Sequence, residues 1–310
     1  MTSIDLHCDT ASRLLYENLS LNKSICKVDI EKLRKSKALA QVFANFIELN
    51  IVDNPYEEFK KMYNNFIGEI DKNAKNIVIV RNLSELENAN ANGKIGAFLA
   101  IEEGEVLEGK VERVKEMYNL GIRFITLTWN FKNSIGYPNG DYKYKDKGLT
   151  EKGKEIVNEM ERLGIIPDCS HLSDGGFYDL VNICKKPFIA THSNARAVTN
   201  HPRNLTDDMI VKLSNKGGVM GLNFCAPFLG DKEIPDMLEM IAHLKHVKNV
   251  GGIDVLALGT DFDGIENEVE IKNIGEIGKL SQALIKEGFK ESEIDKIFFG
   301  NVKRVIKECL

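Results

Sequence analysis

The sequence lacks the features that mark membrane-embedded, disulfide-stabilised and nucleic-acid-binding proteins. It has no apolar run of membrane-spanning length, and its six cysteines are scattered without a CxxC pair. Lys and Arg are spread along the chain and the net charge is −5, so neither nucleic acid nor a membrane surface is expected as a partner. Scattered cysteines in apolar contexts are typical of reduced, buried thiols, which favours a cytoplasmic location.

No targeting or anchoring segment is apparent either. Strand-like residues begin within a few residues of the start, which leaves no room for a signal peptide, and the sequence ends in a helical pattern without an apolar tail. We therefore expect neither secretion nor a lipid anchor.

What the sequence does contain is a regular alternation of short apolar runs and helical periodicity. Such alternation predicts parallel strands joined by helical crossovers, and eight runs favour one closed (β/α)8 barrel of TIM type over residues 1–310. The runs are 4–6, 38–46, 95–101, 122–128, 165–168, 188–191, 219–224 and 255–259. Helices are predicted at 54–72, 108–119, 150–163, 206–214 (with Thr206 as its N-cap), 235–248 and 291–309.

Two connections are long for a barrel. Residues 20–36 follow the first strand, and residues 130–148, rich in Tyr, Lys, Gly and Asn, follow the fourth. Long loops at the carboxyl ends of barrel strands commonly shape the active site, so 130–148 is either a lid or specificity loop or a plain surface excursion.

The first strand carries His7 and Asp9 two residues apart. On a strand these side chains leave the same face, about 7 Å apart at their Cα atoms, while Cys8 turns to the opposite face. An imidazole and a carboxylate so placed can share a divalent metal, with zinc the usual ion. A strand that simply ends in a polar turn is the plain alternative.

Polar side chains also follow other predicted strands. They are Glu102 or Glu103, His171, His192 and Asp261. Because the carboxyl ends of barrel strands meet at one mouth, we expect these groups to converge. One metal could be held by His7 and Asp9 and a second by His171 and His192, with a carboxylate between them, and Asp261 could transfer a proton.

Each of these residues also has an ordinary structural interpretation. A single His at a strand end is more often a core residue than a ligand, and Asp168 could satisfy backbone groups inside the barrel. His243 and His246 are predicted to lie on the surface. Arg203 could form a surface ion pair or clamp a carboxylate with two hydrogen bonds.

Taken together, the motifs resemble the renal (membrane) dipeptidase family of zinc peptidases, within the amidohydrolase-like barrels. The matching pieces occur in family order and span nearly the whole chain. They are Asp-Leu-His-Cys-Asp at 5–9, Ala-Ile-Glu at 100–102, Leu-Gly-Ile-Arg-Phe-Ile-Thr-Leu-Thr at 120–128, Gly-Leu-Thr at 148–150, Asp-Cys-Ser-His-Leu-Ser at 168–173, Thr-His-Ser at 191–193, Pro-Arg-Asn-Leu at 202–205, Gly-Thr-Asp-Phe-Asp-Gly at 259–264 and Gly-Asn at 300–301.

The resemblance implies a role for each matching position. His7 and Asp9 would hold one zinc ion, His171 and His192 the other, and Glu102 would bridge the two. Arg203 would receive the carboxylate of the substrate and Asp261 would act as acid and base near its amine. Glu102 is preferred over Glu103, which stands where relatives often have Gly, but the register stays open at this point.

One position departs from the family pattern. Some members carry a His in the substrate pocket directly after Thr-Leu-Thr, where this chain has Trp129, its only Trp. An indole can stack on a substrate, but it offers no acceptor nitrogen and takes up no proton. Trp129 is thus expected to bind substrate in a different way from that His.

The resemblance implies a binuclear zinc dipeptidase that hydrolyses dipeptides with free termini through a metal-bridging hydroxide, and it suggests a homodimer. The renal type's signal and anchor are absent, which again favours the cytoplasm. Two alternatives remain: a binuclear amidohydrolase that acts on another small amide, lactam or ester, and a metal-stabilised binding protein without catalysis.

Overall fold

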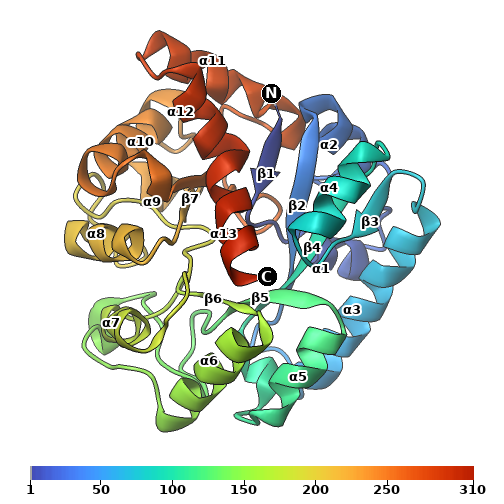
Figure 1. Ribbon diagram of the computed structural model, residues 1–310, viewed down its shortest axis with the longest axis vertical. Coiled ribbons are helices and arrows are strands. Elements are labelled where there is room, and N and C mark those ends of the chain that lie inside the picture. Colours follow the sequence, from blue (N-terminus) through green and yellow to red (C-terminus); the bar gives the residue numbers. More distant parts are fainter. Residues whose placement is uncertain (1) are drawn as a thin grey trace.

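Seven parallel strands form a strongly curled sheet that is surrounded by helices (Figure 1). A computed structural model describes residues 2–310. The strand order is β6-β5-β4-β2-β1-β8-β7, with an eighth strand, β3, paired to β4. The strands are β1 (Ser3–Asp5), β2 (Ala38–Phe46), β3 (Ile77–Ile79), β4 (Ile95–Glu102), β5 (Ile122–Thr126), β6 (Ile166–Asp168), β7 (Met220–Leu222) and β8 (Leu256–Leu258).

The two edges of the curled sheet are joined by residues 188–191, which were predicted as a strand. This segment forms single parallel bridges, Asp168 to Ile189 on the β6 side and Ala190 to Met220 on the β7 side. Backbone hydrogen bonds accompany them, from Ile189 N to Pro167 O (3.0 Å) and from Ala190 N to Val219 O (2.9 Å). The predicted α/β barrel is therefore confirmed, with one of its eight members present as bridges and not as a regular strand.

β3 was not predicted, although residues 77–80 are an uninterrupted run of Ile and Val. It pairs with residues 95–97 of β4, whereas β5 pairs with residues 99–102 of the same strand. Since β2 takes the whole other edge of β4, β3 and β5 share one edge in succession. β3 thus extends the sheet beside the barrel without entering its circle.

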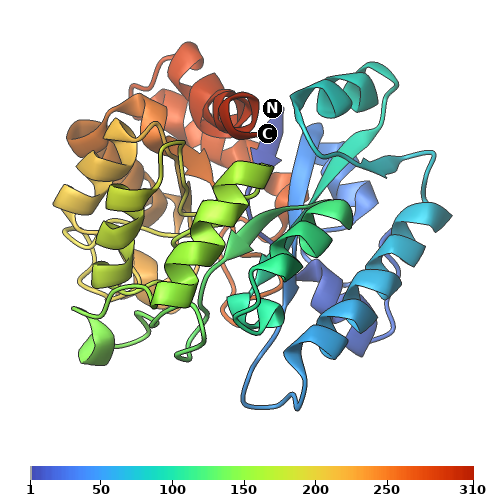
Figure 2. The same ribbon diagram turned by 60° about the horizontal axis from the view of Figure 1, so that its bottom comes forward.

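The helices lie outside the strands, as the turned views show (Figure 2). They are α1 (Thr10–Tyr16), α2 (Ile30–Ser36), α3 (Pro55–Lys72), α4 (Leu83–Ala91), α5 (Glu112–Asn119), α6 (Glu151–Leu163), α7 (Asp174–Ile183), α8 (Asp207–Asn215), α9 (Ala226–Leu229), α10 (Met237–Gly251), α11 (Gly278–Lys286), α12 (Glu291–Asp295) and α13 (Asn301–Cys309). No helix within residues 2–310 is both long and apolar enough to cross a membrane.

Several predicted helices begin or end where local chemistry dictates. Thr206 caps α8 by accepting a hydrogen bond from Met209 N, as predicted, and Thr150 caps α6 in the same way from Gly153 N. The predicted helix 291–309 is interrupted by a π-helical turn at Lys296–Gly300. The predicted long connection 20–36 contains α2, whereas 130–148 is irregular apart from a short 3-10 turn at Tyr142–Tyr144.

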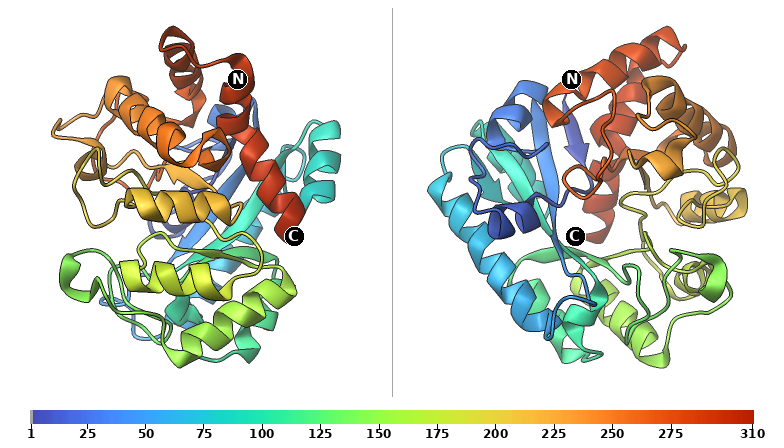
Figure 3. Two further views of the ribbon diagram at one scale, coloured as in Figure 1. Left: turned by 60° about the vertical axis from the view of Figure 1, so that its left-hand side comes forward. Right: turned by 180° about the vertical axis from the view of Figure 1, so that it is seen from behind.

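α13 covers one end of the barrel. It lies across the middle of the front view and behind the strands in the reversed view (Figures 1 and 3). Its Val302 and Val305 share a buried cluster with Ile4, Phe98 and Phe124, which lie on strands ahead of the predicted site residues. α13 therefore closes the amino-terminal end of the barrel and leaves the carboxyl-terminal end for the site.

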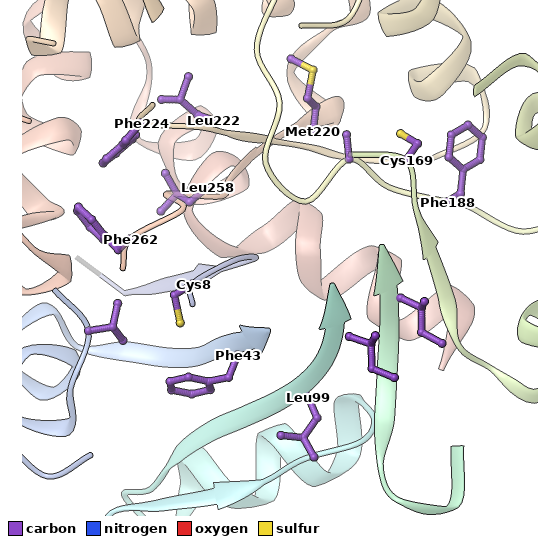
Figure 4. Packing of buried hydrophobic residues seen from close by; sticks show 14 of the residues in the cluster. Cys8, Phe43, Leu99, Cys169, Phe188, Met220, Leu222, Phe224, Leu258 and Phe262 are labelled. Atoms are coloured by element: carbon purple, nitrogen blue, oxygen red, sulfur yellow. The ribbon is translucent and has the colours of Figure 1, made fainter. Parts of the chain in front are cut away.

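A second, larger hydrophobic cluster lies between the strands and the surrounding helices. It includes Phe43, Leu99 and Phe262, which pack in the interior together with Cys8 (Figure 4). Cys8 thus points away from His7 and Asp9, as strand alternation predicts.

Candidate active site

The predicted site residues come from five different parts of the barrel and meet at its carboxyl-terminal end. His7 and Asp9 follow β1, and Glu102 is the last residue of β4. His171 follows β6, His192 follows the bridging segment 188–191, and Asp261 follows β8. All six side chains lie close together, so the fold brings together residues up to 254 positions apart (261 − 7).

Glu102 lies at the centre of this cluster and presents one oxygen to each half. Its Oε2 lies 3.1 Å from His7 Nε2, while its Oε1 lies 3.1 Å from His171 Nε2 and 3.6 Å from His192 Nε2. Asp9 Oδ2 lies 3.4 Å from His7 Nε2. The arrangement is what a carboxylate shared by two cations would need.

The donor set fits divalent cations. Three carboxylates, Asp9, Glu102 and Asp261, are almost fully buried or line the cluster, and no Lys or Arg of the described chain forms an ion pair with them. The Nε2 atoms of His171 and His192 face each other at 2.9 Å beside Glu102. Buried acceptors packed together without a cationic partner are unfavourable, and His nitrogens with carboxylate oxygens are ligands that zinc accepts.

The titration behaviour of the cluster differs between its two halves. Although burial lowers the pKa of His7, the charges of Glu102 and Asp9 raise it well above the ordinary value, so His7 must release a proton to a bound metal. Burial raises the pKa of Glu102 to about 8, against the lowering effect of His7 and with a further rise from the charge of Asp9. Burial likewise raises the pKa of Asp261 to about 7. Burial lowers the pKa values of His171 and His192 well below the ordinary value, which leaves neutral imidazoles, the form that binds metals. Bound cations would favour the ionised carboxylates.

Glu103 faces away from the cluster. Its φ of +98° is a backbone conformation typical of Gly. Its carboxylate accepts hydrogen bonds from Trp129 N, Glu105 N and the side chain of Asn133. The structure therefore places Glu102 in the cluster and gives Glu103 the task of holding the chain after β5.

A cavity of about 580 Å³ opens above the cluster and is lined by Glu102, Asp261, Trp129 and Arg203 among others. Arg203 is only 3% exposed, and none of its three guanidinium nitrogens has a hydrogen-bond partner within residues 2–310. The guanidinium lies 5.2 Å from the centre of the Phe228 ring. A buried, permanently charged group without a hydrogen-bond partner among the described residues is suited to bind an anionic ligand, and a carboxylate matches its fork.

Trp129 and Phe46 form an apolar wall in the same cavity. Their rings meet edge to face at 4.8 Å, and the indole lies 6.2 Å from the His171 ring. Phe46 ends β2 and Trp129 follows β5, whereas Arg203 follows the bridging segment between β6 and β7. Phe46 therefore lies across the barrel from the segment that precedes Arg203, and Trp129 follows a strand between the two.

Three residues in this region were not singled out from the sequence. Asn130 Oδ1 lies 3.1 Å from His171 Nδ1, Thr191 Oγ1 lies 2.8 Å from His192 Nδ1, and Asn223 Nδ2 donates to Asp261 Oδ2 at 2.9 Å. Thr191 belongs to the Thr-His-Ser motif at 191–193 but was given no role, and only its place directly after Trp129 could have pointed to Asn130.

The prediction that His243 lies on the surface was wrong. His243 is buried, accepts a hydrogen bond from Ala195 N at Nδ1 (3.1 Å) and donates from Nε2 to Leu229 O (2.9 Å). His246, one turn further on, is partly exposed and contacts Asp207. The two residues face different environments because α10 packs against the loop after residue 194 on one side only.

Comparisons with known proteins place the chain among related sequences and folds. A family model described as membrane dipeptidase (peptidase family M19) matches residues 1–309. An uncharacterized dipeptidase of Schizosaccharomyces pombe is 29% identical over 310 residues, covering 90% of this chain and 71% of its own length. An uncharacterized protein in the pqqA 5′ region of Klebsiella pneumoniae is 30% identical over 233 residues, covering 72% of this chain and 86% of the relative.

Solved structures share the fold. A metallopeptidase from Rhodobacter sphaeroides, liganded with a phosphinate mimic of the dipeptide L-Ala-D-Ala, superposes with a TM-score of 0.91 at 24% identity and covers 100% of this chain and 99% of that one. The probable dipeptidase PvdM from Pseudomonas aeruginosa gives a TM-score of 0.91 at 17% identity, with 100% and 95% covered.

Proposed function

This chain belongs to the membrane dipeptidase family, and we propose that it is a binuclear zinc dipeptidase that hydrolyses dipeptides with free termini. His7 and Asp9 would hold one zinc ion, His171 and His192 the other, and Glu102 would contribute one oxygen to each. When bound, the pair of ions supplies an acidified water as the nucleophile and polarises the scissile carbonyl. The remaining tasks fall to the protein's own groups.

The observation that carries the proposal is the unpaired Arg203 guanidinium in the cavity above the cluster. A dipeptide brings a carboxylate about one residue away from its only peptide bond. When that carboxylate binds Arg203, the peptide bond next to it comes to the cluster. Arg203 thus favours substrates with a free C-terminus and directs cleavage to their last peptide bond, which in a dipeptide is the only one.

Asp261 is proposed to protonate the leaving amine. Asn223 holds its Oδ2, which leaves Oδ1, 3.9 Å from His7 Nε2, facing the cluster. Burial raises the pKa of Asp261 to about 7, so the carboxyl can both hold and release a proton near neutral pH. A φ of +61° keeps the residue in a turn that aims this side chain at the cavity.

The wall formed by Phe46 and Trp129 is proposed to contact the first residue of the substrate. With the carboxylate on Arg203 and the peptide bond at the cluster, the N-terminal residue would extend away from Arg203 toward Phe46 and Trp129, which line the same cavity. Apolar aromatic faces favour large apolar side chains at that position.

A second candidate function is hydrolysis of another small amide, lactam or ester. It is favoured by Trp129, which cannot accept a proton or a hydrogen bond where some relatives have a His. Strong preference for an uncharged amide over any dipeptide would support this alternative.

The test combines metal analysis with a matched pair of substrates, a dipeptide and its C-terminal amide. We expect about two zinc ions per chain, and His171→Ala should lose one ion and nearly all turnover. Arg203→Met should lower kcat/KM for the free dipeptide by about 100-fold, since truncating one partner of a buried charged pair costs about 2–5 kcal/mol. The amide, which never carried the charge, should be hydrolysed equally by both proteins. A protein without metal, or an Arg203→Met variant that still prefers the free carboxylate, would contradict the proposal.

A further inference from the structure

Asp168, at the end of β6, links three neighbouring members of the barrel. It is fully buried, and its Oδ1 accepts hydrogen bonds from Ser170 N and Thr191 N, both at 2.9 Å. Its Oδ2 accepts from the hydroxyls of Thr126 (2.6 Å) and Thr191 (2.5 Å). Four donors thus converge on one carboxylate directly beneath the proposed zinc ligands.

The Thr191 hydroxyl connects this carboxylate to His192. Its single proton goes to Asp168 Oδ2, because the carboxylate can only accept. His192 Nδ1 lies 2.8 Å from the same hydroxyl oxygen, so the histidine must be the donor in that contact. The proton of the neutral imidazole is thereby placed on Nδ1, and the lone pair of Nε2 points toward Glu102 and His171.

His171 is held in the same state from a different side. Its Nδ1 lies 3.1 Å from Asn130 Oδ1, an oxygen that can only accept. Asn130 is exposed and begins the 130–148 segment, whereas Thr191 and Asp168 are buried in the barrel. In contrast, Nδ1 of His7 has no hydrogen-bond partner among residues 2–310. Among residues 2–310, hydrogen bonds to the Nδ1 atoms of the clustered histidines are therefore confined to His171 and His192.

We propose that Asp168–Thr191 and Asn130 are positioning residues that fix the tautomers of His192 and His171 and present both Nε2 atoms as ligands to one zinc ion. The inference rests on the proposed zinc site. A neutral imidazole has two tautomers, and only the one protonated at Nδ1 can bind a metal through Nε2. Without the outer hydrogen bonds, zinc binding must first select the tautomer and the ring orientation, which commonly weakens affinity 10–100-fold.

The chain offers a matched set of variants for this test. Thr191→Val keeps the shape and removes the acceptor for His192, whereas Thr191→Ser keeps the hydroxyl. Thr126→Val removes an equivalent hydrogen bond to the same oxygen of Asp168, but the Thr126 hydroxyl contacts no histidine. On the exposed side, Asn130→Ala removes the acceptor for His171 and Asn130→Asp retains it, with no buried packing at stake.

The measurement is zinc affinity, obtained by competition with a chelator and resolved for each of the two equivalents. Thr191→Val and Asn130→Ala should each weaken one equivalent about 10–100-fold and leave the other unchanged. Thr191→Ser and Thr126→Val should bind like the wild type, and Asn130→Asp at least as tightly.

Two results would overturn the inference while the proposed function stands. One is that both single variants, Asn130→Ala and Thr191→Val, bind zinc with wild-type affinity. If Thr191→Val does not fold, wild-type affinity in Asn130→Ala is enough. The other is a loss in Thr126→Val as large as that in Thr191→Val, which would trace the effect to barrel packing. A wild-type protein that binds no zinc would instead refute the proposed function and this inference together.

Discussion

Two adjacent carboxylates at the end of β4 have different tasks because the backbone turns sharply between them. Glu102 points into the cluster, and Glu103, at φ +98°, points to the chain after β5. A non-glycine residue in this region costs about 1–3 kcal/mol. Three hydrogen bonds to the Glu103 carboxylate offset that cost, and two of them, from Trp129 N and the Asn133 side chain, hold the segment after β5. Strain at one residue thus orders the wall of the cavity.

At Trp129 the proposal about the substrate's first residue can be tested by exchange with the residue that some relatives carry. Trp129→His should lower kcat/KM for dipeptides that begin with Phe or Leu by about tenfold relative to Gly-initiated ones, because it shortens the apolar wall against Phe46. The measurement is a panel of dipeptides with one common second residue, and zinc content serves as the control. An unchanged ratio between large and small first residues would show that the wall does not touch the substrate.

The site residues differ in how well their positions can be predicted from the sequence. Strand ends and barrel geometry are enough to bring His7, Asp9, His171 and His192 to one mouth, since each stands within three residues of the end of an apolar run. The choice between Glu102 and Glu103 depends on a single φ angle that no periodicity reveals. The contact of Asn130 depends on the path of its loop, and Thr191, although it stands in the motif at 191–193, is a residue type that gives no sign of its hydrogen-bond partners.

Among the elements, α10 contributes a pH-sensitive contact through His243. Burial lowers the pKa of His243 to about 4, while an unfolded His titrates near 6.5. The unfolded chain therefore binds more protons below pH 6.5, and stability contributed by this residue is lost as the pH falls from 6.5 toward 4. The loss at pH 5 is about 2 kcal/mol.

Urea unfolding of the metal-free protein at pH 7 and pH 5 measures this effect. The wild type should lose about 2 kcal/mol more than His243→Gln between the two pH values. Contributions from the other histidines cancel in the difference, because both proteins contain them. Equal losses in the two proteins would mean that His243 takes up its proton without cost in the folded state.

The predicted elements that failed did so for identifiable physical reasons. β3 was missed because its run of Ile and Val lies outside the alternation of eight strands and helices. It pairs with the first residues of β4, on the edge whose remaining residues pair with β5. α2 was missed inside a segment that looked like a loop. Residues 188–191 form only bridges, because β6 and β7 on either side are just three residues long. Whether such a segment forms a regular strand depends on the strands beside it, and the residues of the segment itself do not reveal which strands those are.

For the whole molecule, the proposed ions connect parts of the barrel that the sheet itself joins weakly. Their ligands follow β1, β4, β6 and segment 188–191, the last of which is held by single bridges. Removal of zinc by a chelator should therefore lower the free energy of unfolding. The expected loss is about 4 kcal/mol if the free zinc concentration before chelation was about a thousand times the dissociation constant. Hydrogen exchange should increase first in residues 188–193.

His192→Ala is the control for this effect, because a protein that cannot bind the second ion should respond less to the chelator. His246→Ala, which alters a partly exposed histidine away from the cluster, should respond like the wild type. A chelator that removes both ions without moving the unfolding midpoint would show that the barrel closes without them.

α13 closes the amino-terminal end of the barrel, because Val302 and Val305 fill the route through its centre. In the proposed reaction, substrate and products must therefore pass through the same opening above Glu102. If a dipeptide is the substrate, the product amino acid that retains the carboxylate would stay bound to Arg203 after the other product has left. We therefore expect release of that amino acid to limit turnover, and its accumulation to inhibit the reaction by competing with substrate for the same opening.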